Sequence, residues 1–272
     1  MTMATEPAPG QSENEDFAGA VARAAVLLDG AGLPGSEDGG CVHGVAWYAR
    51  RLGTRLLGAL AQEDDASLTG TLSSAIGDVA GSHRATCDLG HPATPSATVV
   101  ILRERGSDLD YLVLADSTLV FDGPQLEPTV VTDRRLAAIG QRYRAQMDAL
   151  VGGSTEHAKA RADYVAALRA HRNREGGFFV AAADPDAAWH AMTGSVPSSG
   201  VRTALLLSDG ASRLNDRFKL RTWNETLELA RSQGPNALIA AVRGAECADP
   251  QGRRWPRGKI FDDATVVLCD LV

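Results

Sequence analysis

The cysteines of this chain are few and too widely spaced to form a recognisable motif. They are Cys41, Cys87, Cys247 and Cys269, with no CxxC pair among them. This spacing argues against a zinc site and against a disulfide framework. His83 and His91 flank Cys87 in SHRATCDLGH, but a metal site built on that segment would need tighter spacing.

Long apolar runs are also missing. No segment approaches the ~18 consecutive apolar residues that a membrane span requires. The first residues, MTMATEPAPGQSENED, are acidic and lack the apolar stretch typical of a secretory signal. We therefore expect a cytoplasmic protein.

Basic clusters are absent as well. The chain carries 27 Lys and Arg against 34 Asp and Glu, a formal charge of −7, and shows no arginine run or basic stripe. Nucleic acids and anionic membranes are recognised by clustered cations, so neither is expected as a partner.

Apolar periodicity predicts strands and helices in blocks rather than in strict alternation. β-branched and apolar runs predict strands at 22–28, 97–102, 111–115, 118–121, 129–131, 176–180, 203–207 and 264–269. Helical spacing predicts helices at 45–60, 68–79, two between 134 and 170, a short one at 185–192, and two more at 223–233 and 236–246.

This order of elements indicates an α+β fold in one domain. We expect two antiparallel β-sheets packed face to face and flanked by helices, an αββα sandwich. Residues 1–13 are rich in Pro, Gly, Glu and Ser, and we expect them to be loose or to form an edge. The domain then runs over 14–272, with a helical region at about 134–200.

Acidic residues recur at the ends of the predicted strands. They are Glu15, Asp16, Asp29, Asp116, Asp209, Asp262 and Asp263. Asp-Gly and Asp-Ser pairs commonly form turns, which explains any one of them. A carboxylate at the end of a buried strand is nevertheless costly unless it is solvated, capped or bound to a cation. If these strand ends converge, their oxygens suit Mg²⁺ or Mn²⁺.

Five short segments carry a resemblance to a known family. In order along the chain they are SENEDF, VLLDGAG, ATVVIL with YLVLADSTLVF, ALLLSDGASR and DDATVVL. Together they resemble the motifs N-E-D, D-G-x-G, G-D-S-R, S-D-G and D-[ND]-x-T of the metal-dependent serine/threonine protein phosphatases of type 2C, in particular the bacterial branch. The likeness extends from Asn14 to Leu268.

The resemblance implies roles for individual residues around two or three Mn²⁺ or Mg²⁺ ions. Asp29 would bridge two ions, with the carbonyl of Gly30 binding one of them. Asp209 and Asp262 would complete the first site. Glu15 or Asp16 would hold the second ion, directly or through water.

The resemblance gives the two remaining acidic residues weaker roles. Asp116 would belong to a third, weaker site that it shares with Asp209. Asp263 stands where the family has Asn and would hydrogen-bond the turn instead of binding metal.

The chain departs from the family at the position expected to bind phosphate. Relatives carry an arginine three residues before the Asn of N-E-D, whereas this chain has Gln11, which supplies no charge. Candidate replacements are Arg23, Arg172, Arg174, Arg202 and Arg213. Ala31 stands where eukaryotic relatives have a histidine proposed as general acid, and the nearby His43 is better explained as a residue of the first helical turn.

The resemblance predicts a phosphatase in which metal-activated water hydrolyses phosphate monoesters, mainly phosphoserine and phosphothreonine in proteins. The Gln11 departure leaves open a phosphatase for a small-molecule phosphate ester. The third alternative is a non-catalytic member of the family that binds phosphoproteins. The retention of Asp29, Asp209 and Asp262 argues against it. In the family, a mobile flap occupies the region that is predicted to be helical here. The arginines of this chain in that region fit a solvated helix face; they are Arg134, Arg135, Arg142 and Arg144.

Overall fold

The strands of the protein form two antiparallel sheets in a computed structural model that describes residues 1–32, 40–62, 66–123 and 128–271. The first sheet has the order β1 (Thr2–Glu6), β10 (Ala264–Asp270), β9 (Thr203–Leu207), β6 (Thr118–Asp122) and β7 (Thr129–Val131). The second has the order β2 (Phe17–Val21), β3 (Ala24–Ala31), β4 (Ser96–Arg105), β5 (Asp108–Leu114) and β8 (Met192–Pro197).

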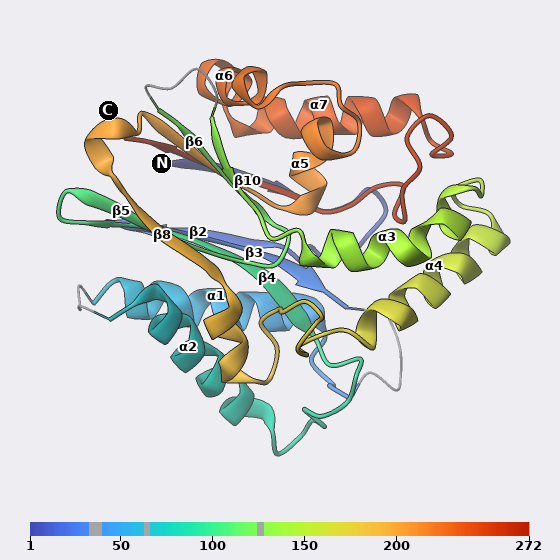
Figure 1. The fold of residues 1–272 in the computed structure, drawn as a ribbon, viewed down its shortest axis with the longest axis horizontal. Helices are drawn as coiled ribbons and strands as arrows, with labels where there is room; N and C mark the ends of the chain where they lie inside the picture. The colour runs from blue at the N-terminus through green and yellow to red at the C-terminus, as the bar shows by residue number, and fades with distance from the viewer. Residues whose placement is uncertain (33–39, 63–65, 124–127, 272) are drawn as a thin grey trace.

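Helices cover the outer face of each sheet, so the molecule has four layers (Figure 1). The second sheet is covered by α1 (Val45–Leu60) and α2 (Leu68–His83), and the first by α5 (Asp209–Asp216), α6 (Trp223–Gln233) and α7 (Pro235–Ala248). At one side α3 (Arg135–Asp148) and α4 (Thr155–Arg169) pack against each other. Short 3-10 turns are η1 (Pro185–His190) and η2 (Ser198–Gly200). The predicted αββα sandwich is confirmed.

The middle parts of the central strands are apolar because both of their faces are buried there. In β3, Val26 and Leu28 face the helices α1 and α2, whereas Ala25 and Leu27 face the opposite sheet. Successive side chains of a strand point to opposite faces, so a strand between two apolar layers reads as a continuous hydrophobic run. The same alternation in β4, β9 and β10 produces one core between the sheets and one under each helical layer.

Two parts of the sequence-based fold are corrected. Residues 2–6 are not loose but form β1, an edge strand paired with β10, as the edge-forming alternative required. The strand predicted at 176–180 is absent from the described residues. Gly176 has a φ of +71°, and Gly177 N–H donates to the Arg174 carbonyl, so the chain makes a turn there.

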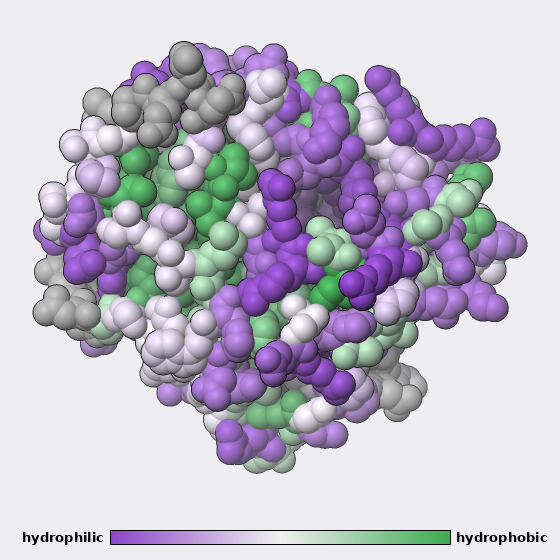
Figure 2. All heavy atoms as spheres, viewed as in Figure 1, coloured by the Kyte–Doolittle hydropathy of each residue, from purple (hydrophilic) through white to green (hydrophobic). Residues whose placement is uncertain are grey.

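The helical region after β7 presents a polar surface. Hydrophilic side chains predominate over α3 and α4 in Figure 2. Beneath them Ile139, Phe178 and Val180 form a small separate apolar cluster with Ala115. Within the described ranges, no helix combines the length and the apolar character that a membrane crossing needs.

Candidate metal centre

The strand register of the first sheet brings three predicted acidic residues to one end of the sandwich. Leu207, the last residue of β9, pairs with Thr118 at the start of β6 and with Val266 near the start of β10. Residues that follow β9 must therefore lie beside residues that precede β6 and β10. Those residues are Asp209, Asp116 and Asp262.

The second sheet contributes Asp16 and Asp29 to the same end. Asp16 immediately precedes β2, whose Phe17 pairs with Leu28 of β3, and Asp29 follows Leu28. The two sheets are joined here because the backbone N–H of Asp209 donates a hydrogen bond of 3.1 Å to Asp29 Oδ2. We call Asp16, Asp29, Asp116 and Asp209, which gather at this end, the acidic cluster.

Two glycines next to the acidic cluster are required by close packing of backbone. A side chain at Gly30 would overlap the carbonyl oxygen of Glu15, and a side chain at Gly210 would overlap the carbonyl oxygen of Asp263. Both obstacles are main-chain atoms that cannot rotate away. The glycines of the D-G and S-D-G motifs therefore let the segments that carry the acidic residues pack together.

Burial, with the charges of neighbouring carboxylates, raises the pKa of each carboxylate of the acidic cluster. Burial and the charges of Asp209, Asp16 and Asp262 hold the pKa of Asp29 well above its usual range. Burial, with the charge of Asp209, raises the pKa of Asp116 to about 7. Desolvation by the surrounding protein atoms and the charge of Asp262 raise the pKa of Asp209. Its side chain nevertheless keeps access to solvent.

Asp16 shows most clearly that the acidic cluster suits a cation. Its side chain is 6% exposed, and burial raises its pKa to about 8. Its Oδ2 atom has no hydrogen-bond partner among the described residues. A buried carboxylate oxygen without a partner is expensive unless it is protonated or bound to a cation. The oxygen donors and the excess negative charge therefore fit hard divalent ions.

The acidic cluster is an open site rather than a closed cage. Among the described residues, it does not bring three ligand oxygens within 4.8 Å of one another. Mg²⁺ commonly binds through one or two carboxylates and keeps several waters, so an open arrangement suits it. The exposure of Asp209 leaves the site accessible from solvent.

Asp262 and Asp263 are surrounded differently from the acidic cluster. Asp262 Oδ2 accepts a hydrogen bond of 2.8 Å from Arg213, and its Oδ1 accepts one of 2.6 Å from Lys259. The oxygens of Asp263 each accept a 2.7 Å hydrogen bond from a backbone N–H, one from Ala8 and one from Glu15. The hydrogen-bonding role expected for Asp263 agrees with these contacts.

The buried arginine beside Asp262 belongs to a longer chain of ion pairs. Arg213 is 8% exposed and also donates to Glu246, whose side chain is fully buried. Glu246 in turn accepts a hydrogen bond from Arg243. Of the arginines proposed to replace the phosphate-binding residue, Arg213 contacts this group of carboxylates. Arg172 instead binds carbonyls of the 92–94 loop, and Arg202 pairs with Asp122.

Lys259 is a cation of the site that sequence reasoning missed. Burial lowers its pKa, but the charges of Asp262, Asp209 and Asp29 more than offset that and raise it. Its charge also acts on Glu15, whose pKa burial raises. The sequence feature that could have identified Lys259 is its position three residues before Asp262. The side chain of Gln11 is exposed and makes no hydrogen bond with the described residues.

Asp116 has acidic neighbours that the motifs did not indicate. The charges of Asp133 and Asp216 contribute, after burial and Asp209, to its raised pKa. The preceding Ala115 has a φ of +69°, a left-handed conformation that favours glycine. This explains physically why the related motif has Gly-Asp where the chain has Ala-Asp.

Solved structures with the same architecture match the chain over nearly its whole length. The catalytic domain of the serine/threonine protein phosphatase PstP in complex with 2 manganese ions has a TM-score of 0.56 at 16% identity, covering 99% of this chain and 96% of that chain. Stp1 from Staphylococcus aureus has a TM-score of 0.58 at 14% identity, covering 99% and 93%. The chain has the fold of the PPM serine/threonine phosphatases.

A third structure with the PPM fold is MsPP from Mycobacterium smegmatis in complex with cacodylate, with a TM-score of 0.54 at 16% identity over 100% of this chain and 97% of that chain. No family model and no curated protein sequence matches the chain. The likeness therefore lies in the fold and the short motifs rather than in overall sequence.

Proposed function

We propose that the protein is a metal-dependent phosphatase that hydrolyses phosphate monoesters, with phosphoserine and phosphothreonine of proteins as the main substrate class. The observation that carries the proposal is the acidic cluster at one end of a PPM fold, where burial and neighbouring carboxylates raise the pKa of its members. A cation that binds there relieves this repulsion, and the open side of Asp209 admits a substrate.

Mn²⁺ or Mg²⁺ ions would be held by residues on both sheets. Asp29, Asp209 and Asp262 would hold the first ion, and Asp29, the Gly30 carbonyl and Glu15 or Asp16 the second. Asp116 and Asp209 would hold a third, weaker one. Bound there, such ions activate a water nucleophile and screen the negative oxygens of the phosphate. The manganese in the related PstP structure supports this choice of metal.

The residues of the chain orient the site around these ligands. Arg213 holds Asp262 from the buried side, and Asp263 fixes the Ala8 and Glu15 backbone so that the 7–16 segment stays beside β3. Lys259 supplies the ammonium nearest to the carboxylates, with a side chain one-third exposed. We assign it the role of attracting the phosphate, which the uncharged Gln11 cannot fill.

One observation favours a second candidate, a small-molecule phosphate ester as substrate. Gln11 provides no charge for a phosphopeptide, and the cations that contact the site, Arg213 and Lys259, lie next to Asp262. A site whose positive charge is deep and compact selects for a small phosphate as readily as for a protein.

A cytoplasmic location remains the expectation from sequence.

The deciding experiment is phosphate release from a phosphopeptide library and from a panel of phosphorylated metabolites, with Mn²⁺, with Mg²⁺ and with EDTA. We expect metal-dependent release that EDTA abolishes. Asp122→Asn is a matched control, because Asp122 lies at the opposite end of β6 and pairs with Arg202. Release that persists in EDTA, or no release from either panel, would refute the proposal.

A further inference from the structure

A second group of metal-binding side chains lies outside the acidic cluster. Cys41 and His43 belong to the segment that precedes α1, and Cys87 follows the C-terminal end of α2. The Cys87 sulfur lies 3.3 Å from the Cys41 sulfur and 3.3 Å from His43 Nδ1, and the Cys41 sulfur lies 3.6 Å from the same nitrogen. Two thiols and an imidazole therefore converge on one point.

These distances match the edges of a zinc tetrahedron. With Zn–S near 2.3 Å and Zn–N near 2.0–2.1 Å, two sulfurs lie about 3.8 Å apart and a sulfur and a nitrogen about 3.6 Å apart. The three observed separations differ from these values by at most about half an ångström. In contrast, the sulfurs of a disulfide lie about 2.05 Å apart, and both cysteines are free thiols here.

The backbone around the three side chains is held in place. The Asp88 N–H donates a 2.7 Å hydrogen bond to the Gly40 carbonyl, which joins the two segments next to the cysteines. The His43 ring stacks on Trp47 with a centroid separation of 4.1 Å. Preorganised ligands lose little freedom when they bind a metal, so the site does not require a large rearrangement.

His83 lies beside the group with one ring nitrogen available. Its Nδ1 is 2.6 Å from the Val79 carbonyl, which can only accept, so Nδ1 carries a proton and a metal ligand would have to be Nε2. The ring is buried and lies 5.7 Å from that of His43, centroid to centroid. Coordination by His83 would require a shift of this ring, and water can fill the position otherwise.

We propose that Cys41, His43 and Cys87 bind a zinc ion, with the fourth position taken by water or by His83. This proposal departs from the sequence-based expectation of no zinc site, which rested on the wide spacing of the cysteines and on the spacing of Cys87 from His83 and His91. The zinc would fasten the start of α1 to the end of α2.

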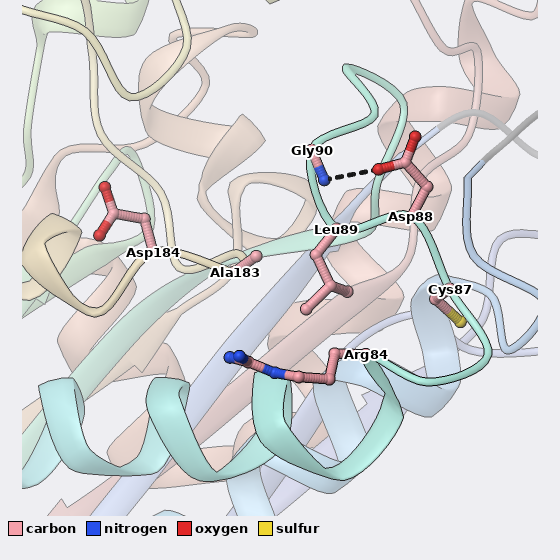
Figure 3. Close-up of a pocket in the computed structure, with 7 residues that line it drawn as sticks. All are labelled: Arg84, Cys87, Asp88, Leu89, Gly90, Ala183 and Asp184. Atoms are coloured by element: carbon pink, nitrogen blue, oxygen red, sulfur yellow. Dashed lines mark hydrogen bonds between the residues drawn. The ribbon is translucent and has the colours of Figure 1, made fainter.

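The proposed zinc site would lie close to the acidic cluster without being part of it. Val45, two residues after His43, packs against Gly30, since a side chain added at Gly30 would overlap Val45. Cys87 also lines a surface hollow of about 440 Å³, and Figure 3 shows its sulfur pointing away from the neighbouring Arg84 and Leu89. The zinc would therefore sit behind the wall of this hollow and support the segment that carries Asp29.

The test measures metal content of the full chain purified with a reductant and without added chelator. We expect about one zinc per chain by elemental mass spectrometry. Replacement by Co²⁺ should give a thiolate-to-cobalt charge-transfer band. Cys41→Ser, Cys87→Ser and His43→Asn should each lose the zinc, whereas Cys247→Ser, at an exposed free thiol, should retain it.

Two further variants keep the result interpretable. Asp29→Asn should retain zinc, which separates this site from the acidic cluster. His83→Gln should change the visible cobalt bands if His83 is the fourth ligand and leave them unchanged if water is. Circular dichroism identifies any variant that fails to fold, and for such a variant the cobalt band of the wild-type chain decides.

Protein without stoichiometric zinc and without a cobalt–thiolate band would overturn the proposal. Recovery of Cys41 and Cys87 as a disulfide that zinc does not prevent would overturn it as well, because the pair would then be a redox bond. Zinc retained in both cysteine variants would place the ion elsewhere.

Discussion

The carboxylates at the proposed metal end fall into two groups that differ in their surroundings. Asp262 and Asp263 have both oxygens hydrogen-bonded, the first to the side chains of Arg213 and Lys259 and the second to backbone N–H groups. In the acidic cluster, burial and the charges of nearby carboxylates raise the pKa values. The carboxylates of the first group are held in place by hydrogen-bond donors of the chain, and Asp262 would also bind an ion. The second group is left with charge for a ligand to neutralise.

Neutralising a member of the acidic cluster tests the difference between the two groups most directly. Asp29→Asn and Asp209→Asn should each lower kcat for p-nitrophenyl phosphate with Mn²⁺ by at least about a hundredfold, because each removes a proposed ligand. Without metal, their melting temperatures should equal or exceed that of the unaltered chain, since a repelling charge is gone. Full turnover in either variant would contradict the assignment, and Asp122→Asn serves as the unaffected control.

The opposite result is expected when Asp263 is removed. Asp263→Ala should lower the free energy of unfolding by about 2 kcal/mol, because two buried backbone N–H groups lose a charged acceptor. Asp263→Asn keeps one acceptor oxygen and should lose about half as much. Urea unfolding in EDTA measures both. Unchanged stability together with lost Mn²⁺ binding would show that Asp263 is a ligand.

Lys259 connects the two groups, and its removal should affect metal binding with the opposite sign to the aspartates. Lys259→Met should raise the affinity for Mn²⁺ by about tenfold, since a positive charge next to Asp262 and Asp209 is lost. Calorimetric titration measures this, with Lys159→Met on the exposed face of α4 as a control. Weaker binding would mean that the ammonium organises the site.

A pH dependence of the metal-free protein is also expected. The pKa values of Asp16 and Asp116, about 8 and about 7, exceed the unfolded value of 3.8, so the folded chain holds protons that the unfolded chain releases. The free energy of unfolding without metal should therefore fall as pH rises from about 4 to about 8. Mn²⁺ affinity should rise over about pH 6 to 8, with proton release detectable in buffers of different ionisation enthalpy. A pH-independent affinity would contradict the raised pKa values.

The sequence predicted the buried parts of the fold better than its edges. The helix at 45–60 and the strands around Leu27 and Leu205 follow from apolar periodicity alone. One full face of the helix and both faces of the strands are buried. The strands β2 and β8 were missed because their side chains are half-buried or exposed and carry little pattern. The helix α5 was missed because it is short and begins within the S-D-G motif.

For the candidate site, ordered motifs identified acidic residues that the strand register brings together, although their ligation of metal stays a prediction. Lys259 and Asp133 were missed because charge proximity depends on how separate segments fold together. The pairing of Cys41 with Cys87 was missed for the same reason, since 46 positions separate the two residues in the chain. No spacing rule links residues that far apart.

The position of β10 has a consequence for how the protein forms during synthesis. β10 is the last strand in the sequence, but it lies inside the first sheet, between β1 and β9. A nascent chain therefore cannot complete this sheet, or bring Asp262 and Asp263 to Arg213 and Ala8, until residues 264–270 have left the ribosome. Pairings between such distant segments form slowly because long loops must close first. Asp262 and Asp263 are therefore placed only when β10 has paired with β1 and β9, so a chain that ends before β10 cannot position them.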